Sequence, residues 1–188
     1  MFRTTDGGGS WQNITGALPT GDAALTNIAV SPTDARRLWV TFSGYKADVK
    51  VFASTDGGAT WTNLSEGLPN LPANTVAART GASNGVFVGL DVGVYYRDDV
   101  LGKWTPFADG LPYSSVQSLV VDEKNRRIVA ATFGRGIWQS ALPEPCQANC
   151  SAPSPSPRTS QAFQAPLAPP GGYLGAVDIF EPQGAPAR

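Results

Sequence analysis

The chain has 188 residues, with 14 basic and 15 acidic side chains, no histidine and a net charge of −1. This length suits one domain with a tail, and the balanced charge excludes the basic surface that nucleic-acid binding needs. No apolar run approaches the ~20 residues of a membrane span. Without histidine the chain lacks the usual general base and the commonest metal ligand, so we expect no cofactor and no metal.

Short runs rich in Val, Ile, Phe, Tyr, Trp and Thr, bounded by Gly, Pro, Asn and Asp, predict β-strands over most of the chain. No useful stretch has the 3.6-residue apolar period of a helix, so the expected fold class is all-β. In chain order, the expected strands are residues 2–6, 10–14, 26–31, 37–42, 49–54, 60–64, 75–79, 85–90, 93–97, 103–107, 116–121, 127–132 and 136–140.

A repeated segment divides these strands into groups. "TTDGGGSWQNITGALP" (residues 4–19) matches "STDGGATWTNLSEGLP" (54–69), and "RDDVLGKWTPFADGLP" (97–112) is a degenerate third copy. The first two copies are 50 residues apart and the third follows 43 residues later, because a longer loop lies near "SGYKADV" (43–49). Four strands per ~43 residues is the sequence signature of a β-propeller blade.

The strand count predicts a partial propeller in residues 1–140. It would comprise a half blade (1–19), two four-stranded blades (20–69 and 70–112) and an incomplete three-stranded blade (113–140). Since closed propellers have about four to eight blades, we expect missing upstream blades, or self-association of several chains, to close the ring, and we favour the first.

Residues 141–188 are dominated by Pro, Ala, Ser and Gln and predict a disordered linker or tail, with "YLGAVDIF" (173–180) as its apolar island. This segment contains both cysteines, Cys146 and Cys150. Two thiols cannot complete a tetrahedral zinc site, so we interpret them as a small disulfide or as two free thiols. A disulfide requires an oxidising compartment, which favours an extracellular or periplasmic protein whose signal peptide lies upstream of this chain.

The residue types of the repeated segment suit a tight hairpin turn. Its Asp can accept hydrogen bonds from backbone N–H groups of the turn, its glycines can adopt positive φ, and its Trp can pack between neighbouring blades. A calcium loop would need several oxygen ligands at close spacing, and a phosphate cradle would need a helix after the glycines. The positions to which we assign this structural role are Asp6, Gly7, Gly8, Trp11, Asp56, Gly57, Gly58, Thr60, Trp61, Asp99 and Trp104.

These segments resemble the Asp-box, or bacterial neuraminidase repeat, over about residues 1–140. "TDGGGSW" and "TDGGATW" are specific matches, whereas "DDVLGKW" has lost both glycines and the hydroxyl. Similar boxes occur in sialidases, xyloglucan-degrading glycoside hydrolases, sortilin-type receptors and photosystem II assembly-factor-like propellers. "RIVAATFGRGIWQS" (127–140) looks like the last blade of exported bacterial propellers. The resemblance implies that the boxes are structural and lie away from the active face.

Candidate ligand-binding residues fall in the loops between strands two and three of each blade and between blades. In a propeller these loops share the face opposite the boxes, and their polar side chains suit a glycan or a peptide. The candidates are Tyr45, Lys46, Asp48, Asp91, Tyr113 and Arg135, with Asp22, Asn70 and Asn74 beside them.

Asp48 and Asp91 are the natural carboxylate pair if the chain hydrolyses glycosides. "LDVGVYYRDD" (90–99) resembles the segment that carries a catalytic Asp in xyloglucan-degrading propellers, with Leu90 in place of Thr and Val94 in place of a second Gly. The D-V-G turn is also frequent in non-catalytic blades, and the arginines form no sialidase-type clamp. We therefore predict a non-catalytic binding or scaffold segment; the alternative is the C-terminal fragment of a glycoside hydrolase with catalytic residues mostly upstream.

Overall fold

The computed structural model of the chain describes residues 1–81, 83–143 and 163–164, and within these ranges it contains β-strands and no helix. The all-β prediction is therefore confirmed, and no described helix could span a membrane. The strands are β1 (Phe2–Arg3), β2 (Gln12–Asn13), β3 (Leu25–Val30), β4 (Leu38–Phe42), β5 (Val51–Ser54), β6 (Thr62–Asn63), β7 (Ala73–Ala78), β8 (Val86–Leu90), β9 (Gly93–Arg97), β10 (Thr105–Pro106), β11 (Val116–Asp122), β12 (Arg127–Thr132) and β13 (Gly136–Ala141).

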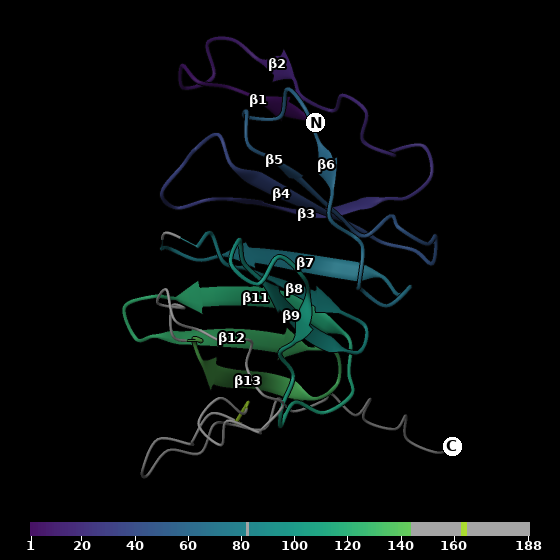
Figure 1. Cartoon of the computed structure of the whole chain (residues 1–188), viewed down its shortest axis with the longest axis vertical. Coiled ribbons are helices and arrows are strands. Elements are labelled where there is room, and N and C mark those ends of the chain that lie inside the picture. The colour runs from purple at the N-terminus through teal and green to yellow at the C-terminus, as the bar shows by residue number, and fades with distance from the viewer. Residues whose placement is uncertain (82, 144–162, 165–188) are drawn as a thin grey trace, which may run out of the picture.

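The strands form antiparallel sheets that follow one another along the chain (Figure 1). Strands β1 and β2 form a pair, β3–β6 and β7–β10 form two four-stranded sheets, and β11–β13 form a three-stranded sheet. Within each sheet every strand pairs with the next one in sequence, and the first strands β3, β7 and β11 are neighbours in space. Each sheet is thus one blade of a partial propeller, with its first strand innermost.

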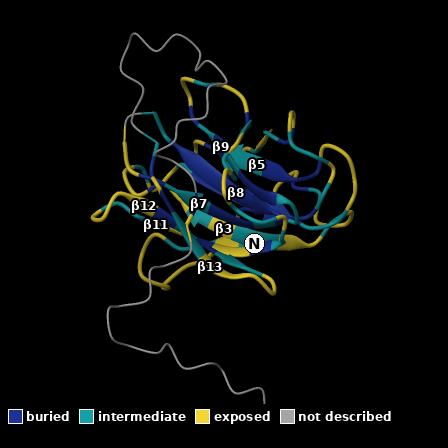
Figure 2. Ribbon diagram, turned by 90° about the horizontal axis from the view of Figure 1, so that it is seen from below, coloured by how far each residue is buried: buried dark blue, intermediate teal, exposed yellow. Residues whose placement is uncertain are grey.

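The hydrophobic core lies between the blades. Figure 2 shows β8 buried along its length, because the sheets on either side cover both of its faces. Trp39, Val88 and Trp104 belong to the cluster between the β3–β6 and β7–β10 sheets, whereas Phe87 belongs to the next cluster along the chain. Position 89 requires glycine because the next blade packs closely against it. A Cβ there would lie 2.7 Å from Cγ1 of Val116.

Two turns built on Asp-Gly-Gly, at residues 4–11 and 54–61, close the hairpins β1–β2 and β5–β6, and we name them the DGG turns. In the second turn, Oδ1 of Asp56 accepts hydrogen bonds from the Ser54 hydroxyl (2.8 Å) and the Thr60 N–H (2.9 Å). Its Oδ2 accepts a bond from the Thr60 hydroxyl (2.6 Å). Asp6 makes the same three bonds with Thr4 and Ser10. Each carboxylate therefore bonds within its own turn.

The glycines of the second DGG turn allow the preceding blade to approach closely. Gly57 and Gly58 have φ values of 77° and 91°, which L side chains rarely adopt. A Cβ on Gly58 would lie 2.8 Å from Cβ of Ile14, and the Arg3 guanidinium donates a 2.7 Å hydrogen bond to the carbonyl of Gly57. The turn therefore forms part of an inter-blade contact.

The tryptophans that end the second and third repeated turns also bond to the preceding blade. Trp61 donates its indole N–H to the carbonyl of Ile14 (2.9 Å), and Trp104 donates to the equivalent carbonyl of Leu64 (2.6 Å). Trp11 is the first member of the series and is 61% exposed. Trp61 and Trp104 thus each tie two blades together.

The carboxylates of the DGG turns make stability depend on pH. Hydrogen bonds from Thr60 and Ser54 hold the pKa of Asp56 well below its usual range. A lowered pKa in the folded state stabilises the fold above the unfolded-state value of about 4, and this stabilisation is lost as the pH falls below that value. We expect Asp56→Asn to lower the melting temperature by a few degrees at pH 7, and the deficit to shrink between pH 4 and pH 2.

Circular-dichroism melts of the wild type and of Asp56→Asn at pH 7, 4 and 2.5 measure this dependence. Glu66→Gln is the matched control, because Glu66 is exposed on a loop between blades. A deficit of Asp56→Asn that keeps the same size at all three pH values would show that the ionised carboxylate does not stabilise the turn.

The third turn, between β9 and β10, differs from the DGG turns. In this turn, Oδ1 of Asp98 accepts hydrogen bonds from the backbone N–H groups of Val100 (3.1 Å) and Leu101 (2.7 Å). The alignment of the repeats predicts that Asp99, one residue later, accepts the hydrogen bonds of this turn. In the structure the Asp99 side chain is instead exposed. There Asp99 meets Arg37 and Asn84 of the neighbouring loops. In the degenerate copy, Asp98 therefore bonds within the turn, and Asp99 forms an ion pair with Arg37 of the preceding blade.

Part of the predicted tail packs against the last blade. Strand β13 extends to Ala141, and Leu142 is buried in the core. Phe163 is 3% exposed and lies edge-to-face against Phe107, with ring centroids 5.8 Å apart. Gln164 and Gln139 exchange both backbone hydrogen bonds, as neighbouring antiparallel strands do. Phe163 and Gln164 therefore occupy the place of a fourth strand beside β13, where a disordered tail had been expected. Cys146, Cys150 and residues 173–180 lie outside the described residues.

Candidate functional site

The loops of the predicted ligand face lie at the opposite end of the strands from the DGG turns. They are the β4–β5 loop, the β8–β9 and β12–β13 turns, and the segments that join one blade to the next. The structure therefore brings the sequence-predicted residues to one face of the molecule, in separate groups.

Asp91 lies in the β8–β9 turn, at the centre of a polar cluster formed with two neighbouring strands. Its Oδ1 accepts hydrogen bonds from the Asn74 amide (2.9 Å) and the Ser115 hydroxyl (2.6 Å). Asn74 also donates to Ser115, and so does the Gln117 amide. Because Asn74 belongs to β7 and Ser115 precedes β11, the cluster ties together the inner edges of two blades.

The long β4–β5 loop carries the predicted residues Tyr45, Lys46 and Asp48. Tyr45 is 68% exposed, and Lys46 forms a 2.7 Å ion pair with Asp22. Asp48 is exposed and adopts a left-handed φ of 58°, and its backbone carbonyl accepts a bond from Asn63. The loop thus presents an aromatic ring and a charged pair to solvent. Asn70 is exposed in the next connection.

Two exposed aromatic rings, Tyr113 and Phe133, lie on adjoining segments of this face, and we name them the aromatic pair. Tyr113 is 91% exposed and Phe133 is 76% exposed. The segments are joined because the Ser114 hydroxyl donates to the carbonyl of Phe133, whose N–H donates to the carbonyl of Ser115. Arg135 follows in the same turn and is exposed. Aromatic surface and polar donors therefore lie side by side near the Asp91 cluster.

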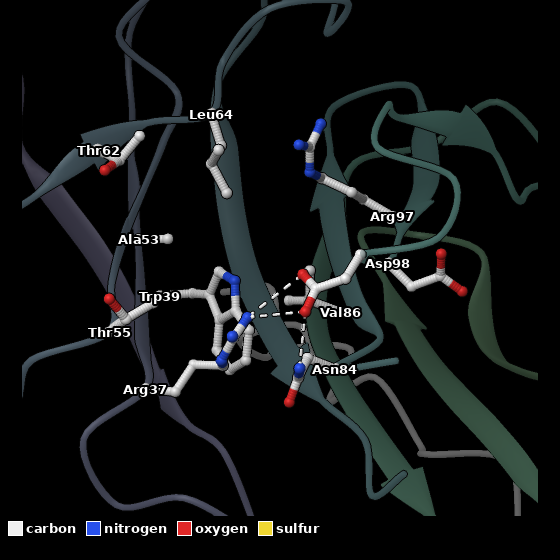
Figure 3. Close-up of a pocket in the computed structure, with 11 residues that line it drawn as sticks. Arg37, Trp39, Ala53, Thr55, Thr62, Leu64, Asn84, Val86, Arg97 and Asp98 are labelled. Carbon is white, nitrogen blue, oxygen red and sulfur yellow. Dashed lines mark hydrogen bonds and ion pairs between the residues drawn. The ribbon is translucent and has the colours of Figure 1, made fainter. Parts of the chain in front are cut away.

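A pocket of about 180 Å³ lies on the other face, between the β3–β6 and β7–β10 blades (Figure 3). Arg37, Asn84 and Asp99 meet at one end, where Arg37 and Asp99 form an ion pair at 3.3 Å and Asn84 donates to Asp99 at 2.7 Å. The side chains of Trp39, Ala53, Leu64 and Val86 supply apolar walls, and those of Thr55, Thr62, Arg97 and Asp98 complete the lining. We name this the inter-blade pocket.

Sequence reasoning found neither Phe133 nor the inter-blade pocket. Phe133 precedes a Gly-Arg-Gly turn and lies in the expected loop between residues 132 and 136, where only Arg135 was singled out. The pocket residues come from five strands and their connecting loops, and no spacing in the sequence connects them. The degeneracy of the third repeat was the one available signal, because it replaced a hydroxyl with Arg97.

Comparisons with known proteins agree with the architecture. Neither a family model nor a curated protein matches the sequence. A GH74 xyloglucanase from Xanthomonas campestris superimposes with a TM-score of 0.59 and 14% identity, over 75% of this chain and 25% of that one. An ancestral GH74 enzyme gives a TM-score of 0.53 and 16% identity, over 74% and 21%.

These likenesses identify the class of protein. Both neighbours have the propeller fold, and at 14% and 16% identity they show the fold alone. The chain is therefore part of a β-propeller, and it spans about a quarter of the length of the two enzymes.

Proposed function

We propose that the chain is a non-catalytic binding segment of an Asp-box β-propeller in an exported bacterial protein, and that it holds a glycan or peptide on the face opposite the DGG turns. The observation that carries the proposal is the aromatic pair, Tyr113 and Phe133, beside Arg135. Exposed rings offer flat apolar surface to the C–H face of a sugar or to a peptide side chain. The neighbouring polar groups can bond to ligand hydroxyls or amides.

The environments of the two candidate carboxylates support binding over catalysis. Oδ1 of Asp91 already accepts two short hydrogen bonds that join strands of two blades, which is a structural task. Asp48 accepts a hydrogen bond at its backbone carbonyl, and no hydrogen bond between the described residues joins it to Asp91. A glycosidase needs two carboxyl groups that face one bond. The glycoside hydrolase alternative is therefore supported by the fold and by the resemblance of residues 90–99, but not by any contact between Asp48 and Asp91.

We also propose that the exposed side of the β1–β2 pair packs against a preceding blade of the parent protein. Trp61 and Trp104 each bond to the blade before them, whereas Trp11 is exposed. A Cβ added at Gly7 or Gly8 would meet nothing within 4 Å, although Gly58, the equivalent of Gly8, lies against Ile14. The same surface is thus covered in the second turn and open in the first.

Removal of the aromatic pair should weaken ligand binding selectively. We expect Tyr113→Ala and Phe133→Ala each to weaken binding of a glycan or peptide found on an array about tenfold, because a stacked ring contributes roughly 1–1.5 kcal/mol. Titration by calorimetry measures the affinity. Val100→Ala is the control, since Val100 is 61% exposed in the third turn, at the other end of the strands.

Three outcomes would contradict the proposed site. One is a ligand whose affinity both aromatic variants leave unchanged, and another is an array on which the full chain binds nothing. The third is hydrolysis of xyloglucan by the chain that Asp91→Asn abolishes, which would make the segment catalytic. Equal losses in Val100→Ala would show that the effect is not local.

A further inference from the structure

The inter-blade pocket exists because one position of the repeat carries a small residue. Arg3, Ala53 and Tyr96 are equivalent, since each pairs with the corresponding residue of the following strand. Each side chain is directed toward the next blade: Arg3 reaches the carbonyl of Gly57, and Tyr96 packs in the core beside Phe87. Ala53 is too short to fill the equivalent space, so the pocket remains there.

The degenerate third turn supplies the pocket with a cation. Arg97 occupies the position at which the DGG turns have Thr4 and Ser54, whose hydroxyls bond to the Asp of their own turn. Within the part of the chain that the structure describes, the Arg97 guanidinium has no hydrogen bond or ion pair, and the side chain lines the pocket (Figure 3). A guanidinium presents paired N–H donors that match the two oxygens of a carboxylate.

The other charged groups around the pocket already have partners. Arg37 is paired with Asp99, and Asp98 accepts hydrogen bonds from the Tyr96 hydroxyl and two backbone amides. Of these four groups, Arg97 is therefore the one whose side chain has no hydrogen-bond or ion-pair partner among the described residues. Thr55 and Thr62 lie across the pocket from Arg97 in Figure 3 and add hydroxyl groups that can donate or accept.

We propose that the inter-blade pocket binds a small carboxylate, which Arg97 holds against the Thr55 and Thr62 hydroxyls while its carbon skeleton lies on Trp39 and Leu64. A volume of about 180 Å³ is below the roughly 300–1,000 Å³ of drug-sized sites, so it suits a single sugar acid or an acidic side chain. This site is separate from the aromatic pair on the opposite face, and the proposal for it does not depend on the proposed function.

Titration of the full-length chain with matched ligands tests this site. The probes are D-glucuronate against D-glucose, and N-acetyl-glutamate against N-acetyl-glutamine, the last two as their α-amides so that only the side chains differ in charge, each followed by the NMR shift of the Trp39 indole N–H. We expect saturable shifts with one or both carboxylates and at least about tenfold weaker binding of the neutral partners. Glucuronate alone identifies a sugar acid, and N-acetyl-glutamate alone identifies an acidic side chain.

Three variants connect binding to the pocket. Arg97→Gln should weaken carboxylate binding about tenfold or more, since it removes the charged guanidinium and leaves a neutral polar side chain. Ala53→Phe should abolish binding by filling the space, with an unchanged or higher melting temperature. Arg36→Gln should bind normally, because Arg36 is exposed beside the pocket and does not line it. The proposal is overturned if no carboxylate binds at millimolar concentration, if neutral partners bind equally, or if Arg97→Gln binds like the wild type.

Discussion

Phe163→Ala should destabilise the last blade by about 3 kcal/mol, the lower end of the cost of emptying a buried Phe site. Phe163 is 3% exposed and contacts Phe107 within the core that also contains Tyr96 and Leu142. Its N–H donates a 2.6 Å hydrogen bond to the carbonyl of Asp109. Without the ring, the short strand at Phe163–Gln164 has little to hold it beside β13.

Urea unfolding gives the change in stability, and hydrogen exchange shows where it acts. The amides of Gln139 and Gln164, which bond to each other's carbonyls, should exchange faster in Phe163→Ala. Phe133→Ala deletes the same ring from a site that is 76% exposed and should cost less than about 0.5 kcal/mol. Equal stability of the wild type and Phe163→Ala, with unchanged exchange at Gln139, would show that the segment does not complete the blade.

The docked segment also shows where composition misleads. Residues 141–188 were expected to be disordered because Pro, Ala, Ser and Gln bury little apolar surface. A single buried ring and three backbone hydrogen bonds were enough to place Phe163 and Gln164 beside β13. The open edge of β13 explains this, since an unpaired strand presents N–H and C=O groups to any extended segment that reaches it. The average composition of a segment cannot show that one residue has such a partner.

The repeats predicted the blades well because the same physical task recurs in each one. A strand that is covered on both faces must be apolar throughout, as β8 is, and the turns between strands require glycine or a self-bonding Asp such as Asp56. Those requirements are local, so they can be read from residue types and their spacing. The observed strands therefore follow the expected ones closely in number and position.

The inter-blade pocket could not be predicted by the same reasoning. It is present because the Ala53 side chain is short and because Arg97 makes no hydrogen bond to an Asp of its own turn. A pocket can be inferred from these two features only when the register of the strands is known, because the register shows that Ala53 is equivalent to Arg3 and Tyr96. The loss of a structural residue in one repeat freed side chains that could then face a ligand. Degenerate copies within a repeat protein are therefore useful places to look for function.

The three repeat tryptophans should differ in cost in the order of their burial. Trp104→Ala should lose about 4 kcal/mol, because Trp104 is 6% exposed in a core cluster and donates to Leu64. Trp61→Ala should lose about 2 kcal/mol, since Trp61 is partly buried and donates to Ile14. Trp11→Ala should lose less than about 0.5 kcal/mol, since Trp11 is 61% exposed. Urea unfolding of the monomeric chain measures all three.

The same series tests whether another blade covers the β1–β2 pair. Trp104→Phe keeps one aromatic ring but loses the N–H donor to Leu64 and the second ring of the indole, so its deficit measures the hydrogen bond and that ring together. In a protein with a preceding blade, Trp11 should reach a carbonyl as Trp61 does, and Trp11→Ala should then cost about as much as Trp61→Ala. A cost for Trp11 that stays below about 0.5 kcal/mol in the longer protein would contradict the packing we propose. A chain that dimerises through this surface would show the higher cost only at concentrations where the dimer forms, because association stabilises by mass action.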